Sequence, residues 1–245
     1  MAEGMTEMQV AFQEKFNSGT AWTRNDKFEK DGYLKVENLW DPEELYHPVP
    51  NLRGQLNYYD KNPDNFNHQD VENQVEGSVS RYWHPQYRNI HSGIRKKLED
   101  TLGRKLYNTY YYDRYYFPGQ ELKKHADRDA CEISVTVHVS TNLPDDLKDW
   151  PIKIKTPDKY TDKKKPSVLV PGEERSCVLN PGDGMIYKGC ERPHWRDAMP
   201  GIPVGKKSKK LFGKKQTEEY YYHQIFFHYV LQDGNRAHCA WDRSR

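Results

Sequence analysis

The chain after Gly103 is a series of short β-prone segments separated by turn signals, and this pattern limits the possible folds more than any other feature. Pro118-Gly119 and the stretch Asn-Pro-Gly-Asp-Gly separate runs rich in Tyr, Val, Ile and Phe. Aromatic and β-branched residues favour strands, whereas Gly and Pro mark turns. Several short strands at close spacing predict a mainly β fold, either a sandwich or a barrel. The strand-like segments are 106–117, 131–140, 149–156, 176–189 and 218–232.

The first hundred residues lack this strand-and-turn pattern. Some segments have the apolar spacing of a helix, and others have the composition of loops. In residues 88–102, Ile90, Ile94, Leu98 and Leu102 recur at a spacing of four, which predicts an amphipathic helix. Gly103 fits the C-terminal stop of that helix.

Other parts of this half are less regular. Residues 5–17 fit a short helix, and residues 28–45 read as a turn, a short strand and a helix that begins at Asp41-Pro42. Residues 47–80 are rich in Asn, Asp, Pro and Gly and read as a long loop, which is functional or disordered when found in a compact domain. We therefore expect three parts: a helical and loop region at 1–104 that packs on the core, a β core at 105–235, and a tail at 236–245.

Composition narrows the class of protein. The chain of 245 residues has a formal net charge of +2, which argues against dedicated nucleic-acid binding. Four widely spaced cysteines without a Cys-x-x-Cys motif argue against a zinc cluster or a disulfide framework. The sequence contains no apolar run near the length of a transmembrane helix and no signal-peptide pattern. We therefore expect a soluble cytoplasmic protein that is not bound to a membrane.

A His-x-Asp pair stands just before the segment 131–140. Side chains two apart on an extended chain point to the same face, so His125 and Asp127 can reach one point in space. His194, which follows the hairpin predicted around Asn-Pro-Gly-Asp-Gly, is the candidate for a third ligand. Two imidazoles and one carboxylate form the facial triad of non-haem Fe(II) oxygenases, which leaves positions open for a bidentate cosubstrate and O₂.

The sequence around these residues, "YYFPGQELKKHADRDACEISVTVHVS" followed by "LNPGDGMIYKGCERPHW", resembles the Fe(II)/2-oxoglutarate dioxygenases, in particular their prolyl 4-hydroxylase-like branch. The resemblance extends over residues 105–232 and, more loosely, over the first hundred. The matching residues are Tyr116, Pro118 and Gly119 before the His-x-Asp pair, Ser134 after it, and Pro181, Gly184 and Tyr187 before His194.

This resemblance implies a fold, a set of cofactors and an activity. The fold is a double-stranded β-helix, a jelly roll of the cupin-like kind, with helices such as 88–102 supporting one face. The cofactors are Fe(II), 2-oxoglutarate as cosubstrate and O₂. The implied activity is hydroxylation of an unactivated C–H bond, in a prolyl residue of a peptide or protein or in a small molecule, with release of succinate and CO₂.

The sequence departs from the family pattern at one position. The family binds the distal carboxylate of 2-oxoglutarate with an Arg or Lys that opens the last strand, whereas Val204 and the region of Tyr222 carry no positive charge here. Our hypothesis is that Arg196, two residues after His194, takes this role, because a guanidinium binds a carboxylate with two parallel hydrogen bonds. Lys206 or Lys207 is the alternative. Further contacts to 2-oxoglutarate are expected from Tyr110, Tyr112, Tyr116, Ser134 or His138.

Each of these residues also has a structural interpretation. His125 and Asp127 alone fit a surface charge pair, His194 alone fits a loop histidine, and Arg196 could pair with Asp197. The lysine-rich stretch 206–215 fits a solvated insertion, a lid or a contact for an acidic substrate.

The identity of the substrate and the oligomeric state stay open at this point. Arg128 and Tyr187 are candidate substrate contacts, and Arg128 fits an exposed side chain equally well. A cupin-like metal-binding protein without oxygenase activity and a partner-binding module are the alternative functions.

Overall fold

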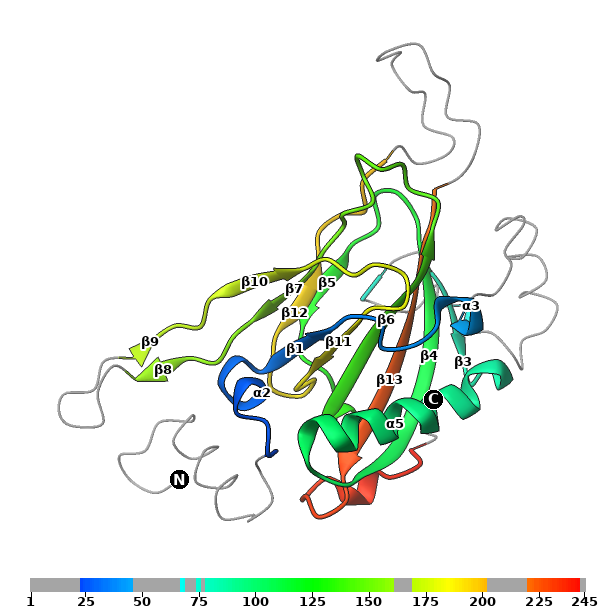
Figure 1. Ribbon diagram of the computed structural model, residues 1–245. Helices are drawn as coiled ribbons and strands as arrows, with labels where there is room; N and C mark the ends of the chain where they lie inside the picture. The colour runs from blue at the N-terminus through cyan, green and yellow to red at the C-terminus, as the bar shows by residue number, and fades with distance from the viewer. Residues whose placement is uncertain are drawn as a thin grey trace, which may run out of the picture.

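The computed structural model of the chain describes residues 23–45, 67–68, 74–75, 78–160, 169–201 and 220–242 (Figure 1). The expected helix 5–17, most of the expected loop 47–80 and the lysine-rich stretch 206–215 lie outside the described residues.

Two antiparallel sheets form the body of the protein. The larger sheet has the strand order β1-β11-β6-β13-β4-β3-β2, and the smaller sheet has the order β10-β7-β12-β5. The larger sheet contains β1 (Tyr33–Val36), β2 (Asn67–His68), β3 (Val79–Tyr82), β4 (Leu106–Tyr116), β6 (Ile133–Thr141), β11 (Gly184–Tyr187) and β13 (Tyr222–Leu231). The smaller sheet contains β5 (Leu122–His125), β7 (Ile152–Lys155), β10 (Glu174–Cys177) and β12 (His194–Arg196), while β8 (Lys159–Tyr160) pairs separately with β9 (Leu169–Val170).

From β4 onward the chain passes back and forth between the two sheets. It alternates between larger and smaller sheet through β4, β5, β6 and β7, and again through β10, β11, β12 and β13. This path is that of a double-stranded β-helix, so the expected fold class is confirmed. The prediction of a hairpin around Asn-Pro-Gly-Asp-Gly is wrong. The strands on either side of this turn do not pair with each other, because β10 pairs with β7 and β11 pairs with β6. The turn therefore carries the chain from one sheet to the other.

The two faces of the larger sheet have different surroundings because side chains alternate along each strand. On β6, Val135, Val137 and Val139 belong to the apolar core under α5, which spans Arg88–Leu102 as expected. Figure 1 shows α5 lying across this outer face of the sheet. The alternate residues of β6 face the interior between the two sheets. The periodicity of α5 is confirmed by Ile90, Ile94, Leu98 and Leu102, which are all buried in that core.

The tyrosine side chains of β4 lie on both faces of the larger sheet. Tyr110, Tyr112 and Tyr116 pack in the interior cluster, whereas Tyr111 packs with the α5 core. The register between β4 and β13 shifts between Phe227 and Tyr229. A shift of this kind is typical of a β-bulge, which changes the face that the following side chains occupy.

The N-terminal part differs from the expected turn, strand and helix in one element. Asp26–Asp31 form a short helix, α2, where the sequence was expected to turn. The Asn25 side chain accepts a hydrogen bond from the backbone N–H of Phe28, and Gly32 ends the helix at a φ of 76°. β1 and the short helix α3 (Pro42–Leu45) follow as expected.

A buried charged cluster lies on the face of β4 opposite the interior. The Arg81 Nε lies 2.9 Å from both carboxylate oxygens of Asp113, and the His223 Nε2 lies 2.7 Å from the Asp113 Oδ2. All three side chains are almost fully buried. Burial by itself would raise the pKa of the Asp113 carboxyl, but the Arg81 charge and the contact with His223 outweigh it and hold this pKa well below its usual range.

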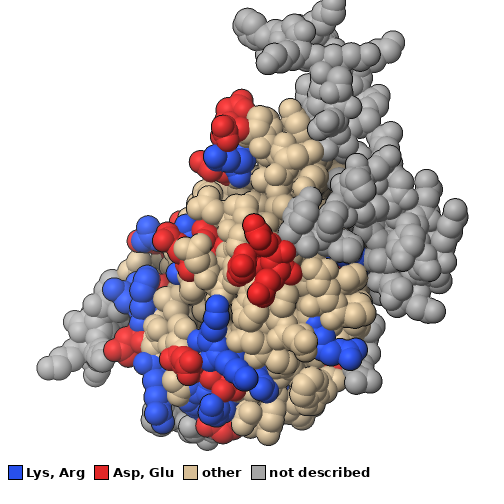
Figure 2. Space-filling view, turned by 45° about the vertical axis from the view of Figure 1, so that its right-hand side comes forward, with Lys and Arg blue, Asp and Glu red and all other residues tan. Residues whose placement is uncertain are grey.

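The surface carries charges of both signs. Basic and acidic side chains are interspersed on the face shown in Figure 2, in keeping with the small net charge. Exposed pairs such as Arg236 with Asp129 at 2.9 Å contribute little individually, about 0–1 kcal/mol. Within the described part of the chain, no helix has the length and apolarity needed to cross a bilayer.

Candidate metal centre

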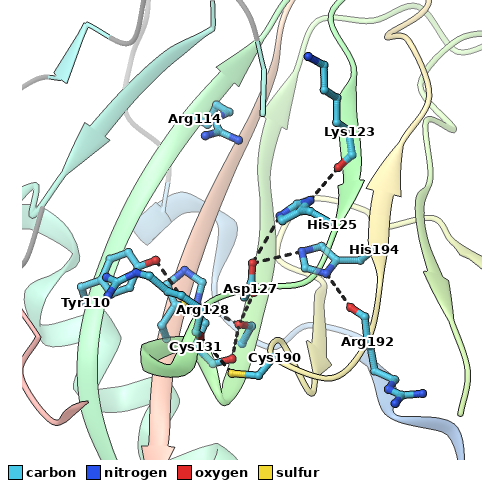
Figure 3. Close-up of polar contacts among 12 residues, drawn as sticks. Tyr110, Arg114, Lys123, His125, Asp127, Arg128, Cys131, Cys190, Arg192 and His194 are labelled. Atoms are coloured by element: carbon cyan, nitrogen blue, oxygen red, sulfur yellow. Dashed lines mark hydrogen bonds and ion pairs between the residues drawn. The ribbon is translucent and has the colours of Figure 1, made fainter. Parts of the chain in front are cut away.

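Three potential metal ligands meet where β5 and β12 lie side by side. His125 is the last residue of β5, His194 is the first residue of β12, and the two are paired in register. Asp127 lies two residues beyond the end of β5, and its backbone N–H donates to the Gly189 carbonyl at 2.9 Å. The structure therefore brings together the three residues that the sequence singled out (Figure 3).

The distances between the donor atoms suit a single ion. The Asp127 Oδ1 lies 3.4 Å from the His125 Nε2 and 3.6 Å from the His194 Nε2. One ligand atom from each residue lies within 4.8 Å of the others. Adjacent ligands bound at about 2.1 Å to one ion stand roughly 3 Å apart, so a small closure of the three donors completes one face of a coordination sphere.

Backbone contacts fix the orientation of both imidazoles. The His125 Nδ1 lies 2.7 Å from the Lys123 carbonyl oxygen, and the His194 Nδ1 lies 3.0 Å from that of Arg192. A carbonyl only accepts, so each Nδ1 carries the proton and donates it. Each Nε2 then presents its lone pair toward Asp127, which is the tautomer that a metal-ligating histidine needs.

The charge states of the ligands suit a cation as well. Burial by itself would raise the pKa of the Asp127 carboxyl, but positive charge placed beside it at His194 and His125 outweighs burial and lowers this pKa below its usual range. A divalent ion bound at the same place takes over from the protons of the rings and stabilises the carboxylate in the same way. Burial lowers the pKa of His194, against an opposing effect of Asp127. A carboxylate with neutral imidazoles is the form that binds a divalent metal. The donor set therefore fits Fe(II) or another first-row divalent ion.

Arg196 is enclosed in the interior, two residues beyond His194. Its side chain is 1% exposed and lies beside the edge-to-face pair of Trp150 and Tyr222, with the guanidinium carbon 4.5 Å and 4.7 Å from the two ring centroids. It donates to the Trp150 carbonyl at 2.6 Å and to the Tyr222 hydroxyl at 3.5 Å. Its Nε has no hydrogen-bond partner, and no carboxylate of the described residues forms an ion pair with it. A buried guanidinium in this state is suited to bind an anion.

Further buried polar atoms, on β6 and β13, lack hydrogen-bond partners. The atoms are Thr136 Oγ1, His138 Nε2, and both the Oε1 and the Nε2 of Gln224, all in buried residues. Gln224 and His138 are paired in register between β13 and β6, and the His138 ring stacks on Tyr222 at 4.1 Å. Buried polar groups are normally hydrogen-bonded. This part of the interior therefore fits a polar ligand.

The other residues expected at the site lie around the same interior. Tyr187 packs against His194 with ring centroids 4.7 Å apart. Arg128 is half-buried, forms an ion pair with Asp242 and lies over the Tyr110 ring at 4.6 Å. Tyr110, Tyr112 and Tyr116 line the β4 side, and Ser134 contacts Asp127. The predicted contacts of these residues with cosubstrate or substrate stay predictions.

Four residues were not selected from the sequence. Gln224 and His228 lie on β13 at alternate positions with Tyr222, and Thr136 lies on β6 between Ser134 and His138. Arg114 is buried on β4, where its Nε donates to the Ser80 hydroxyl at 3.0 Å and its guanidinium lies 5.3 Å from the Tyr112 ring. Figure 3 shows it extending from β4 toward the space between the sheets. Strand alternation from the neighbouring predicted residues was the available signal for Thr136 and Arg114.

Comparison with known proteins supports the fold. No protein-family model and no curated protein sequence matches this chain. Among solved structures, a prolyl-4-hydroxylase from Pseudomonas putida superimposes with a TM-score of 0.50 and 13% identity over 83% of this chain and 95% of that one. A non-haem alpha-ketoglutarate-dependent carbocyclase, SnoK from nogalamycin biosynthesis, superimposes with a TM-score of 0.50 and 11% identity over 96% and 89% of the two chains.

Three observations indicate the same fold: the strand order, the position of the His-Asp-His cluster at the β5–β12 junction, and these superpositions. The chain has the double-stranded β-helix fold of the Fe(II)- and 2-oxoglutarate-dependent oxygenases.

Proposed function

We propose that the protein is an Fe(II)- and 2-oxoglutarate-dependent oxygenase, with the β core at 105–235 as its catalytic part. The observation that carries the proposal is the arrangement of His125, Asp127 and His194, with both Nε2 atoms near one carboxylate oxygen and both Nδ1 atoms held by backbone carbonyls. Among the described residues, the group formed by His125, Asp127 and His194 offers three ligand atoms, which leaves room for small molecules on an ion.

The bound iron would supply the activation of O₂, using electrons from the oxidation of 2-oxoglutarate to succinate and CO₂. The protein supplies orientation and a closed environment. The three ligands fix the ion at the end of the interior, and the interior rings of Tyr110, Tyr112 and Tyr187 restrict access of water.

Arg196 is proposed to bind the distal carboxylate of the cosubstrate, in place of a basic residue on the last strand. Its orphaned Nε supports this assignment, and so do the unpartnered polar atoms of Thr136, His138 and Gln224 in the same interior. A charged hydrogen bond inside a protein contributes about 1.5–3 kcal/mol. Two such bonds to one carboxylate would hold the cosubstrate in a single orientation.

The reaction proposed is hydroxylation of an unactivated C–H bond, with a prolyl residue of a peptide or protein as the first candidate substrate. The similarity to the Pseudomonas putida prolyl-4-hydroxylase supports this choice of candidate. Small-molecule substrates are the second class to test, since the carbocyclase SnoK shares the fold.

Turnover of the cosubstrate tests the proposal directly. Protein loaded with Fe(II) should release succinate from 2-oxoglutarate in the presence of O₂ and ascorbate, slowly without substrate and faster with the right peptide. His194→Ala is the matched control and should abolish the release. If protein that holds one iron releases no succinate under any of these conditions, the oxygenase assignment fails and a cupin-like metal-binding protein is the better reading.

A further inference from the structure

The two oxygens of the Asp127 carboxylate have different neighbours. Oδ1 lies near both imidazole Nε2 atoms, at 3.4 Å and 3.6 Å. Oδ2 accepts a hydrogen bond from the Ser134 hydroxyl at 2.9 Å. The two carboxylate oxygens therefore have different environments: Oδ1 faces the proposed metal position, and Oδ2 is held by a hydrogen bond from the protein.

The Ser134 hydroxyl lies at hydrogen-bond distance from three atoms, and its single proton determines which of them donates. The Ser134 Oγ lies 2.9 Å from the Asp127 Oδ2, 3.2 Å from the Cys131 carbonyl oxygen and 3.0 Å from the His228 Nδ1. The first two atoms only accept, and the hydroxyl has a single proton to give. His228 must therefore be the donor of the third contact, with its proton on Nδ1. This places a chain of hydrogen bonds from His228 through Ser134 to Asp127.

The hydrogen-bonded residues are buried away from solvent and closely packed. Ser134 and His228 are 0% and 2% exposed. The His228 ring packs against Tyr110 and Tyr112, with centroids 4.5 Å and 5.9 Å away. Gly189 provides the necessary space, because a Cβ there would lie 2.4 Å from the Ser134 Oγ and 2.6 Å from the Asp127 Oδ2.

We propose that Ser134 and His228 are positioning residues that hold Asp127 as a one-oxygen ligand. The inference rests on the proposed metal site. With Oδ2 bound to Ser134, only Oδ1 is available to a divalent ion, which keeps the remaining coordination positions open. Partners of this kind around metal ligands orient them, and their loss typically lowers metal affinity 10–100-fold.

Co(II) binding is the test, because it reports on the site without turnover. We expect Ser134→Ala and His228→Leu each to weaken Co(II) affinity about 10–100-fold and to change the visible d–d spectrum, as the freed carboxylate changes its coordination. His228→Asn retains an N–H donor near the Nδ1 position and should restore affinity and spectrum toward wild type. The double variant should be no weaker than the worse single variant, because the two residues act as one unit.

The control is Ser140→Ala, a hydroxyl deletion on the same strand whose described contact is with the Tyr221 hydroxyl at 3.4 Å. Wild-type Co(II) affinity and an unchanged spectrum in both Ser134→Ala and His228→Leu would overturn the positioning role and leave the metal site intact. Wild-type protein that fails to take up one Co(II) would overturn the metal site and, with it, the positioning role. Ser134→Ala decides the question if His228→Leu does not fold, since it removes only a hydroxyl.

Discussion

A guanidinium buried beside two aromatic rings between the sheets is destabilising unless an anion binds it. Arg196 is in this position, with its Nε unpartnered and with only a carbonyl and a hydroxyl among its acceptors in the described residues. Cation–π contacts with Trp150 and Tyr222 orient the group but do not neutralise its charge. The residue therefore has the properties of a binding group held ready for a carboxylate.

Replacing Arg196 by Met should weaken 2-oxoglutarate binding about 10–100-fold, since charged hydrogen bonds contribute about 1.5–3 kcal/mol. Calorimetric titration of Mn(II)-loaded protein with 2-oxoglutarate measures the affinity without turnover. Lys153→Met is the matched control, because Lys153 pairs with Asp197 and is partly exposed. Unchanged affinity in Arg196→Met would assign the carboxylate to another residue, with Arg114 and the lysines at 206–207 next to be tested.

The buried cluster around Asp113 should matter for stability and not for the site. Asp113→Asn would leave the Arg81 charge enclosed without its carboxylate, and breaking a buried pair in this way typically costs about 3–5 kcal/mol. Urea denaturation measures the loss, and Co(II) affinity of the folded protein should remain that of wild type. A loss below about 1 kcal/mol would show that solvent or other groups compensate Arg81.

At the scale of elements, α5 is the main support of the larger sheet. Leu98 lies in the middle of the helix and is 0% exposed against the outer face of that sheet. Leu98→Ala should cost about 2–5 kcal/mol of unfolding free energy through lost burial and the cavity that remains. Chemical denaturation checks this value, and Lys96→Ala on the same helix, at an exposed position, is the control. Equal stability of the two variants would contradict the proposed support.

The helix and the strands could be predicted because each has a local signal. The spacing of four in 88–102 and the Tyr- and Val-rich runs reflect helical and strand periodicities, and these elements form where expected. α2 carries only six residues, so its caps and not its periodicity define it. The path of β10 and β11 into different sheets depends on partners distant in the sequence, which a local turn motif does not specify.

The three candidate metal ligands could be selected from the sequence, because the His-x-Asp spacing and the flanking motif that precedes His194 are visible in the chain. The roles of His228 and Gln224 could not be predicted. Every residue of β13 is buried, and burial on both faces removes the polar–apolar alternation that would separate the side chains of one face from those of the other. Only the packing of β13 between β4 and β6 shows which of its polar side chains reach the interior.

At the scale of the whole molecule, buried histidines should make stability depend on pH. Burial lowers the pKa of His91 to about 3 and that of His138 to about 4. Their folded-state pKa values lie below the unfolded value of about 6.5. As the pH falls below this value, the unfolded chain therefore binds more protons than the folded protein. Stability should therefore be retained above pH 6.5 and decrease from there toward pH 4, by up to about 1.4 kcal/mol per pH unit for each histidine.

Urea denaturation at pH values from 7.5 to about 5 measures this slope. His91→Gln, which retains an N–H donor for the His228 carbonyl at 3.1 Å, should make the decrease shallower. The same slope in this variant and in wild type would show that His91 does not contribute to the pH dependence.

The proposed oxygenase function depends on binding of 2-oxoglutarate to an iron held by His125, Asp127 and His194. Anaerobic titration of Fe(II)-loaded protein with 2-oxoglutarate tests it most directly, through the weak visible metal-to-ligand charge-transfer band expected of a keto acid chelated to Fe(II). The band should appear in wild-type protein and be lost in His125→Ala. Absence of the band in wild-type protein shown to hold one iron would contradict the proposed function.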